Sequence, residues 1–343
     1  MCSICFSKLG SLFPPFFFFF LAVEVGSTMG IKKYVLKRLL WFVPLIFLVQ
    51  TLLFFLLAVI PGDISVLIAT PNAPPETIEA LREELGLNRP LIIQYLDYVT
   101  SVFRGDMGKS FIFRLPVSEV VLGRLVNSLE LVTVGMIVAV VVGIPLGVIA
   151  AIKKDSLYDR SICTGVLFGI SMPLFFIELM VILIFGLYLE WLPVSQRGGP
   201  IWTVEGLRHI ILPSLCLASI CLAMIVRLTR SSMLDVLSED YILTARSKGL
   251  KERVVILTHA LKNAMIPVIT VIGLQYGFLF GNAVVTEVIF DWPGIGRLAY
   301  ESIIMRDFPL IRGAVLSIAL IFIVINLLID LIYLRLDPRI EYE

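Results

Sequence analysis

Long apolar runs separated by short charged segments dominate this chain. A helix needs roughly 17–25 residues to cross about 30 Å of hydrocarbon, and six runs reach that length, at 39–60, 131–152, 162–189, 210–226, 264–289 and 313–334. Helices satisfy their own backbone hydrogen bonds in lipid, and a membrane barrel would instead show alternating segments of about ten residues. The pattern predicts an all-α membrane protein whose bundle has six transmembrane helices.

The composition agrees with a membrane location. Of the 343 residues, 58% are hydrophobic and 16% are charged, whereas a soluble domain carries about 25% charged residues. The formal net charge of +1 gives no attraction to nucleic acid. We therefore expect the lipid bilayer, and no nucleic acid, to surround the chain.

The distribution of Lys and Arg predicts the orientation. With the N-terminus inside, sixteen of these residues lie on the cytoplasmic side and five lie in the two short outer loops. The loop 61–124 holds six more, but a loop of that length translocates largely regardless of its charge. We expect a multi-pass protein of the cell (inner) membrane with both termini in the cytoplasm.

Four segments follow from this topology. Residues 1–28 hold a short apolar run that is too brief to span; they are interpreted as an N-terminal extension, either a mis-assigned start or a dispensable segment, and a signal-like region is the alternative. Residues 29–60 form the cytoplasmic N-terminus and the first span. Residues 61–124 form an extracytoplasmic loop, and residues 125–343 form a five-helix core that includes the cytoplasmic loop 227–266.

The sequence offers no cofactor or metal site and no catalytic apparatus. Cys2 and Cys5 form one CxxC pair without a second pair or a nearby His, which is weak support for a metal. Gly108-Lys109-Ser110 ends like a P-loop, but Phe103 occupies the position of the required first glycine. With two histidines and no HExxH or GxSxG motif, a membrane-bound enzyme is not indicated.

The largest cytoplasmic loop contains a predicted helix. Ser238 is a candidate N-cap, acidic residues follow in the first turn, and Gly249 is suited to the position after the last turn. Tyr241, Ile242 and Ala245 share one face. We expect two short amphipathic helices with basic residues exposed. They either lie among lipid headgroups or dock a soluble partner, and the physics alone leaves both open.

Several motifs resemble one family in the correct order. Residues 239–249 (EDYILTARSKG) resemble the EAA loop of binding-protein-dependent ABC permeases, continued by residues 259–267. Residues 61–63, 84–90 with 94–95, and 105–110 resemble the outer loop of the B-type permease of the dipeptide/oligopeptide/nickel family. Residues 291–296 and 336–339 resemble its closing signatures. Leu243, Thr244 and Lys262 depart from the broad ABC motif; at the first of these positions Leu is usual in the peptide branch.

The resemblance implies an ATP-driven importer of peptides or related small solutes. This chain would form half of the translocation pathway, and its coupling helix would insert into a cytoplasmic ATPase. The implied partners are a second, C-type permease subunit, two cytoplasmic ATP-binding subunits and an extracytoplasmic solute-binding protein. The implied ATPase-coupling residues are Asp240, Tyr241, Thr244, Ala245, Arg246, Lys248 and Gly249.

A proton-coupled secondary transporter is the competing class, because buried acids in membrane spans are functional candidates. Glu178 and Asp330 are its candidate relay carboxylates. We expect Glu178, five residues after Pro173, to face protein or water and not lipid. It would line the pathway, contact the partner permease, or be protonated and bonded to a backbone carbonyl.

Overall fold

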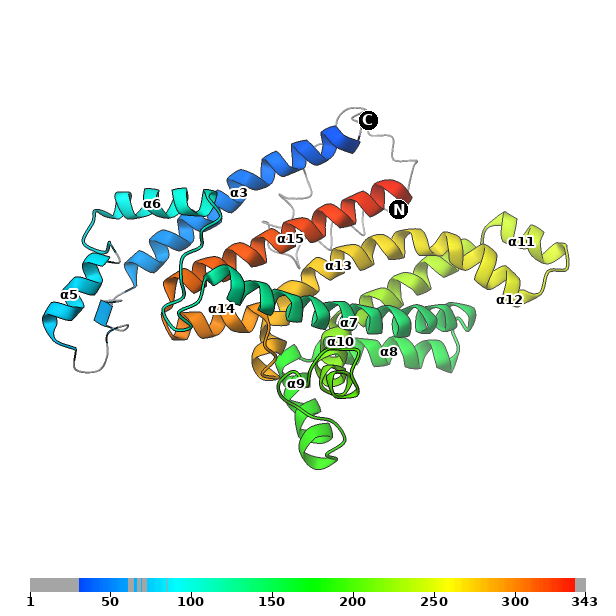
Figure 1. Cartoon of the computed structure of the whole chain (residues 1–343). Helices are drawn as coiled ribbons and strands as arrows, with labels where there is room; N and C mark the ends of the chain where they lie inside the picture. Colours follow the sequence, from blue (N-terminus) through cyan, green and yellow to red (C-terminus); the bar gives the residue numbers. More distant parts are fainter. Residues whose placement is uncertain (1–30, 61–64, 67–68, 70–72, 85, 337–343) are drawn as a thin grey trace.

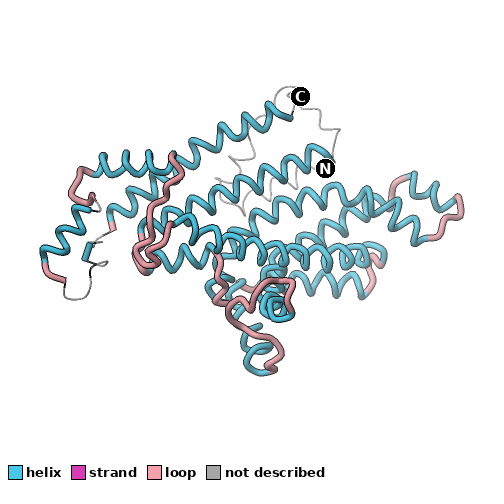
Figure 2. Tube along the Cα trace, viewed as in Figure 1, coloured by secondary structure: helices cyan, strands magenta, loops and turns pink. Residues whose placement is uncertain are grey.

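The computed structural model describes residues 31–336 except 61–64, 67–68, 70–72 and 85. The described part is helical, with an isolated bridge between Lys109 and Pro116 and no strand (Figure 2). Its helices are α3 (Ile31–Val59), α5 (Pro75–Glu84), α6 (Leu91–Phe103), α7 (Val117–Ile152), α8 (Leu157–Ser171), α9 (Leu174–Val181), the π-helical turn η1 (Ile182–Tyr188), α10 (Val204–Leu237), α11 (Asp240–Ser247), α12 (Glu252–Val254), the π-helical turn η2 (Val255–Ala260), α13 (Leu261–Ile289), α14 (Ile295–Ile304) and α15 (Phe308–Leu336). The predicted N-terminal extension, residues 1–28, lies outside the described residues.

Five helical stretches of the described chain are long and apolar enough to cross a membrane: Arg38–Val59, Val117–Ile152, Val204–Leu237, Glu252–Ile289 and Phe308–Leu331. They confirm five of the six expected spans. The expected span 162–189 is instead divided into α8 and the α9–η1 helix. Met172 is extended, with φ −98° and ψ 139°, because the ring of the following Pro173 disfavours the helical conformation of the residue before it.

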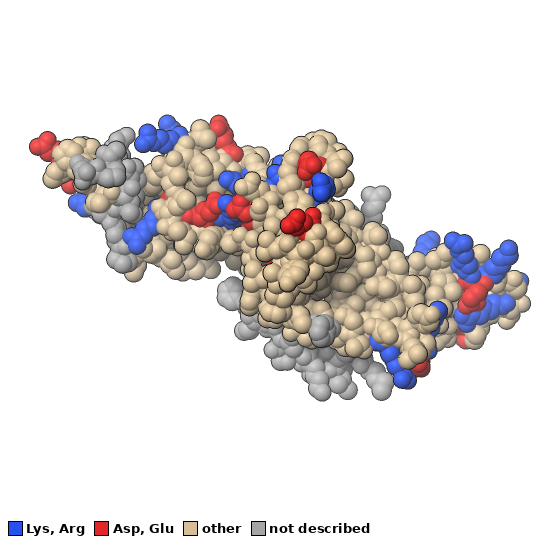
Figure 3. Space-filling view, turned by 90° about the horizontal axis from the view of Figure 1, so that it is seen from below, with Lys and Arg blue, Asp and Glu red and all other residues tan. Residues whose placement is uncertain are grey.

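The long helices lie lengthwise beside one another in an elongated bundle (Figure 1). The short helices α11 and α12 lie at one end, and α5 and α6 lie toward the other. In the face shown in Figure 3, Lys and Arg side chains gather over the α11 and α12 end, and the adjoining part of the bundle is almost free of charge. This arrangement suits a bundle whose apolar middle lies in lipid.

The centre of the bundle is the packing of α7 against α10. Small residues at four-residue spacing on α7 (Gly135, Ala139, Gly143 and Gly147) are buried along this contact. A Cβ added to Gly147 would lie 2.6 Å from the Thr229 Cβ and 2.8 Å from the Val226 carbonyl oxygen. The two backbones therefore approach too closely for a larger residue, as small residues permit in membrane bundles.

Candidate functional site

The loop predicted to couple to an ATPase forms α11, which ends at a glycine. Gly249 has φ +76°, and its N–H donates to the Arg246 carbonyl at 2.9 Å. This left-handed conformation confirms the predicted helix stop, because glycine adopts it without a Cβ penalty. The predicted N-cap was wrong by one residue: Glu239, with ψ 146°, precedes the helix, and Ser238 ends α10.

One side of α11 is anchored in the bundle. Ile242 is fully buried and Ala245 is nearly so. Both belong to a cluster that joins the ends of several helices: Val148 and Ala151 of α7, Met233 of α10, Val255 and Ala260 of η2, and Ala264 of α13. Because this contact is apolar and close, α11 is fixed to the adjoining ends of α10 and α13.

The other side of α11 is exposed. Of the residues expected to contact the ATPase, Asp240, Tyr241, Thr244, Arg246, Lys248 and Gly249 are exposed, whereas Ala245 faces the bundle. Leu243, which was not among the expected contact residues, is also exposed, with 53% of its surface accessible. Six of the seven predicted residues are therefore exposed, and the seventh, Ala245, belongs to the buried contact of α11 with the bundle.

Polar contacts fix the two ends of this surface. The Asn263 side chain donates to the Tyr241 hydroxyl at 2.7 Å, which ties the start of α11 to α13. Arg246 donates to the Glu252 carboxylate at 2.7 Å, and this hydrogen bond raises the pKa of the Arg246 guanidinium. The turn between α11 and α12 is thus held by contacts within the chain.

The second predicted amphipathic helix does not exist as a separate element. The helix α12 continues through η2 into α13 without a break, so that residues 252–289 form one helical stretch. Pro267 lies inside α13. The wider π-helical turn, a common way to accommodate an additional residue in a helix, lies at Val255–Ala260.

A carboxylate clamp braces the same end of the bundle. Asp159 at the start of α8 accepts two hydrogen bonds of 2.7 Å from the Arg230 guanidinium of α10 and one of 3.0 Å from the Asp155 N–H. The Arg230 hydrogen bonds hold the pKa of the Asp159 carboxyl well below its usual range. This bidentate pair fixes α8 beside α10.

Glu178 is a residue of α9 whose side chain contacts α13, and it is completely buried. The hydroxyl of Thr286 donates to one of its carboxylate oxygens, and the other oxygen has no hydrogen-bond partner within the described part of the chain. The carboxyl therefore faces protein and not lipid, and in this conformation it joins the half-helix α9 to the core. Asp330 instead pairs with Arg38 of α3 at 2.5 Å, so the structure does not bring the two candidate relay carboxylates together.

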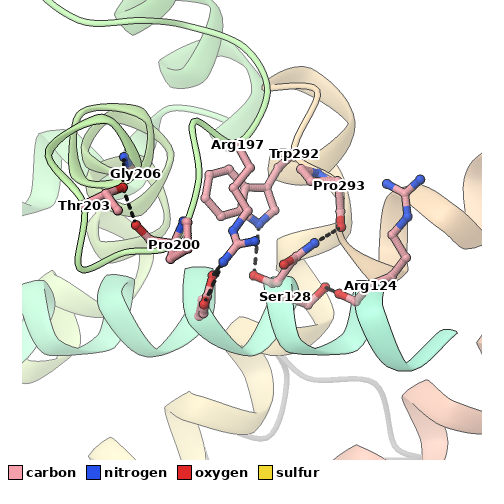
Figure 4. Close-up of polar contacts among 10 residues, drawn as sticks. Arg124, Ser128, Arg197, Pro200, Thr203, Gly206, Trp292 and Pro293 are labelled. Atoms are coloured by element: carbon pink, nitrogen blue, oxygen red, sulfur yellow. Dashed lines mark hydrogen bonds and ion pairs between the residues drawn. The ribbon is translucent and has the colours of Figure 1, made fainter. Parts of the chain in front are cut away.

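A second polar cluster, not identified from the sequence, lies toward the other end of α7 (Figure 4). The buried Trp292 indole donates to the Asn127 carbonyl at 3.0 Å, and the Asn127 side chain donates to the Pro293 carbonyl at 2.8 Å. Nearby, Arg197 of the α9–α10 connection pairs with Glu130 at 2.7 Å. Figure 4 shows Arg197, Trp292 and Pro293 beside α7, on the segments that connect η1 to α10 and α13 to α14.

Glu287 of α13 is the buried acid of this cluster. Its carboxylate accepts from the Ser128 hydroxyl at 2.5 Å and from the Arg297 N–H at 3.0 Å, and the Ile295 N–H donates to the Ser128 oxygen at 2.7 Å. A Cβ on Gly294 would lie 2.1 Å from the Glu287 carboxyl carbon. The acid thus caps the N-terminus of α14, where a negative charge is favourable. A lone acid in the apolar run 264–289 was the available sequence signal.

The described residues contain no group of three His, Cys, Asp or Glu side chains that could hold a metal ion.

Comparisons with known proteins identify the family of this chain. Residues 143–342 match the family described as binding-protein-dependent transport system inner membrane component, and residues 31–132 match its N-terminal domain. The glutathione transport system permease protein GsiC of Escherichia coli K12 is 43% identical over 311 residues, which are 91% of this chain and 99% of that protein. The protein of the same name from Salmonella typhi is 44% identical over the same shares.

Solved structures show the same fold. An inward-facing structure of the MetNI methionine ABC transporter matches with a TM-score of 0.54 and 14% sequence identity, over 64% of this chain and 97% of that one. The chain belongs to the family of inner-membrane permease subunits of binding-protein-dependent ABC importers.

Proposed function

We propose that the exposed side of α11 is the docking surface for a cytoplasmic ATP-binding subunit. The observation that supports this is the division of α11 into a side buried against α7, α10 and α13 and a side whose residues are exposed. A short helix that lies in a groove of its partner is a recurrent recognition mode. The complete importer would contain a second permease, two ATP-binding subunits and an external solute-binding protein.

The buried contact of Ile242 and Ala245 would let the docking surface transmit motion to the bundle. A subunit that moves α11 displaces Ile242 and Ala245, and these residues pack against the ends of three long helices. Because packed interiors transmit displacement with little compression, the motion would reach α10 and α13 and change access to the pathway between the two permeases. This subunit would perform no chemistry of its own.

Short peptides are the proposed solutes, with glutathione the first to test. The support is the identity of 43% over almost the full length of permeases named for glutathione transport. Membrane vesicles that contain the complete importer should accumulate labelled glutathione only with ATP and the binding protein, and vanadate should stop uptake. Uptake that follows a proton gradient without ATP would contradict the proposal.

A matched pair of substitutions tests the docking surface. Leu243→Asp introduces a charge on the exposed side of α11 without removing a buried contact. Leu157→Asp places the same charge on an exposed leucine at the same end of the bundle, in the first turn of α8. We expect solute-stimulated ATPase activity to fall at least about tenfold in Leu243→Asp, as for loss of an interface contact, and to remain in Leu157→Asp. Equal activity in both would contradict the proposed surface.

A further inference from the structure

Two tyrosines attach α6 to α3, which it lies beside at the edge of the bundle (Figure 1). The Tyr95 hydroxyl is 2.7 Å from the Thr51 hydroxyl, and the Tyr98 hydroxyl donates to the side-chain oxygen of Gln50. Both tyrosine rings also pack on Phe54, with centroid distances of 5.3 and 5.7 Å. The helix α6 is therefore attached to a defined part of the first span.

A third helix contributes to the same contact. The guanidinium carbon of Arg312, in α15, is 4.7 Å from the ring centroids of Phe54 and of Tyr98. The cation thus stacks on one residue of α3 and one of α6, and cation–π contacts stabilise such an arrangement. Because α3 and α15 both hold α6, their two spans define the depth of α6 in the membrane.

The contacts with α6 lie inside the spans and not at their ends. Phe54 and Thr51 precede Val59, the end of the first span, by five and eight residues, which is about 8 and 12 Å at 1.5 Å per residue. Arg312 follows Phe308, the start of the last span, by four residues, or about 6 Å. Half of the hydrocarbon core is about 15 Å thick, so both spans place the contacts of α6 at the depth of the acyl chains.

One side of α6 is an exposed apolar stripe. Ile92, Leu96 and Phe103 are 70%, 55% and 76% exposed, and Val99 between them is partly exposed. Successive steps of four, three and four residues keep these side chains on one side of a helix. We call these four residues the apolar stripe. It is distinct from the side that carries Tyr95 and Tyr98.

A third side of α6 is polar. Asp97 and Arg104 are exposed and seven residues apart, which places them on one side of the helix, about a third of a turn away from the apolar stripe. Asp97 also pairs with Arg89 at 3.0 Å, with both side chains mostly accessible. A helix with separate apolar and polar sides is typical of an element that lies along the membrane surface, with its apolar face about 5–10 Å deep.

The apolar surface of α3 continues onto α6. Phe55 of α3 is 44% exposed, and its ring stacks on Tyr95 with the centroids 5.5 Å apart. The neighbouring exposed residues of the same span are also apolar: Leu48, Leu52 and Leu56. The apolar stripe is therefore continuous with a surface that a transmembrane helix presents to lipid.

We propose that α6 lies within the lipid leaflet on its side of the bundle, with the apolar stripe against acyl chains and with Asp97 and Arg104 among the headgroups. The occupant is lipid because the contacts with α3 and α15 place the stripe at a depth that water and soluble proteins do not reach. The polar third side fits headgroups and not the dry interface of a second transmembrane subunit. Part of the predicted extracytoplasmic loop 61–124 would then belong to the membrane-embedded structure.

A label scan in the reconstituted importer tests the proposal. Single cysteines, in a chain whose native cysteines are replaced by alanine, are labelled with a nitroxide at each residue of the apolar stripe, at Asp97 and at Arg104. The ratio of collisions with oxygen to collisions with a water-soluble nickel chelate rises with depth in the bilayer. It should follow the helical period of about 3.6 residues, with values several-fold higher on the stripe than at the two polar positions.

Two reference positions calibrate the scan. Leu52 of α3 is 62% exposed inside a span and gives the value for contact with lipid. Glu76 of α5 is exposed on a polar helix and gives the value for water. Gel filtration of each labelled complex shows that it has assembled.

Three results would overturn the proposal. Ratios on the apolar stripe equal to that at Glu76 would place α6 outside the membrane. Few collisions with either reagent on the stripe would show that a protein, such as the second permease, covers it. A loss of oxygen collisions that requires added binding protein would identify that protein as the occupant.

Direct contact with acyl chains has a separate measurement. A bimane attached to a cysteine at Leu96 should be quenched by phospholipid that carries a nitroxide on its acyl chain, and a bimane at Asp97, one residue away on the polar side, should be quenched several-fold less. Equal quenching at the two positions would mean that α6 has no lipid-facing side. No quenching at Leu96, with normal quenching at Leu52, would exclude the lipid contact even in a correctly assembled complex.

Discussion

At the scale of single residues, Gly249 tests whether the shape of the α11 turn matters for coupling. No atom lies within 4 Å of a Cβ built at this position, so a side chain has room, but φ +76° disfavours a β-branched residue. We expect Gly249→Val to strain the turn by about 1 kcal/mol or more. Solute uptake and permease-stimulated ATPase activity should collapse while membrane insertion persists.

The matched control for this variant is Gly249→Asn, since asparagine adopts the left-handed conformation more readily than other residues. It should keep most of the coupling. If the valine variant couples like wild type, or if both variants fail equally, the conformation of the turn is not what the partner recognises.

The Asp159–Arg230 clamp predicts a pH dependence. The folded-state pKa of Asp159 lies below its usual value, so the clamp stabilises the protein above about pH 4, the ordinary pKa of an aspartate. That contribution is lost as pH falls from there through the folded-state pKa. The melting temperature of the detergent-solubilised protein should therefore fall more steeply below about pH 4 in wild type than in Asp159→Asn. Parallel curves for the two proteins would show that the pair contributes no stability.

At the scale of helices, the contact between α7 and α10 leaves no room for a side chain at Gly147. Gly147→Leu would place atoms within the Thr229 side chain and the Val226 backbone, and overpacking of a core typically costs about 1–3 kcal/mol. Gly123→Leu is the control on the same helix, because a Cβ there meets nothing within 4 Å. Fluorescence-detected gel filtration should show a large loss of monodisperse protein for the first variant alone. Equal yields would mean that α7 and α10 can separate at little cost.

The helices show where sequence reasoning succeeds and where it stops. Apolar runs of sufficient length predicted five spans, because hydrophobic length is a local property. Pro145, Pro213 and Pro267 lie inside continuous helices, whereas Pro173 starts a new one. All four have the same local chemistry. The sequence pattern alone does not distinguish them, and the contact of Glu178 of α9 with Thr286 of α13 joins residues too far apart in the chain for a local pattern to contain.

The functional surfaces also differ in whether a local sequence pattern can predict them. The end of α11 was predicted because a glycine after a short amphipathic run is a signal contained in ten residues. The cluster around Glu287 was not predicted, because its partner Ser128 lies 159 residues away in the chain. Arg312 was counted only as a loop charge, since its two aromatic neighbours come from helices that precede it by more than two hundred residues.

At the scale of the whole molecule, the two ends of the bundle are built differently. Apolar packing and the Asn263–Tyr241 hydrogen bond hold α11 to the ends of α7, α10 and α13. The α14 connection is held to α7 by apolar packing and by a larger set of hydrogen bonds. Apolar contacts are non-directional and permit small shifts, and hydrogen bonds require defined geometry. A displacement that enters at α11 would therefore reach a more rigid structure at the far end of α7.

The orientation of the whole chain in the membrane is the last prediction. The α11 end should face the cytoplasm, because the excess of Lys and Arg marks the inner side, and α5 should lie outside. Glu76 of α5 and Lys251 beyond α11 are both exposed. A cysteine introduced at Glu76, in a chain whose native cysteines are replaced by alanine, should react with an impermeant maleimide applied to intact spheroplasts. A cysteine at Lys251 should react only after permeabilisation, which is the control that the thiol itself is accessible. The reverse pattern would place α11 outside, where it could meet neither ATP nor a cytoplasmic ATPase, and both the charge argument and the proposed docking surface would fail together.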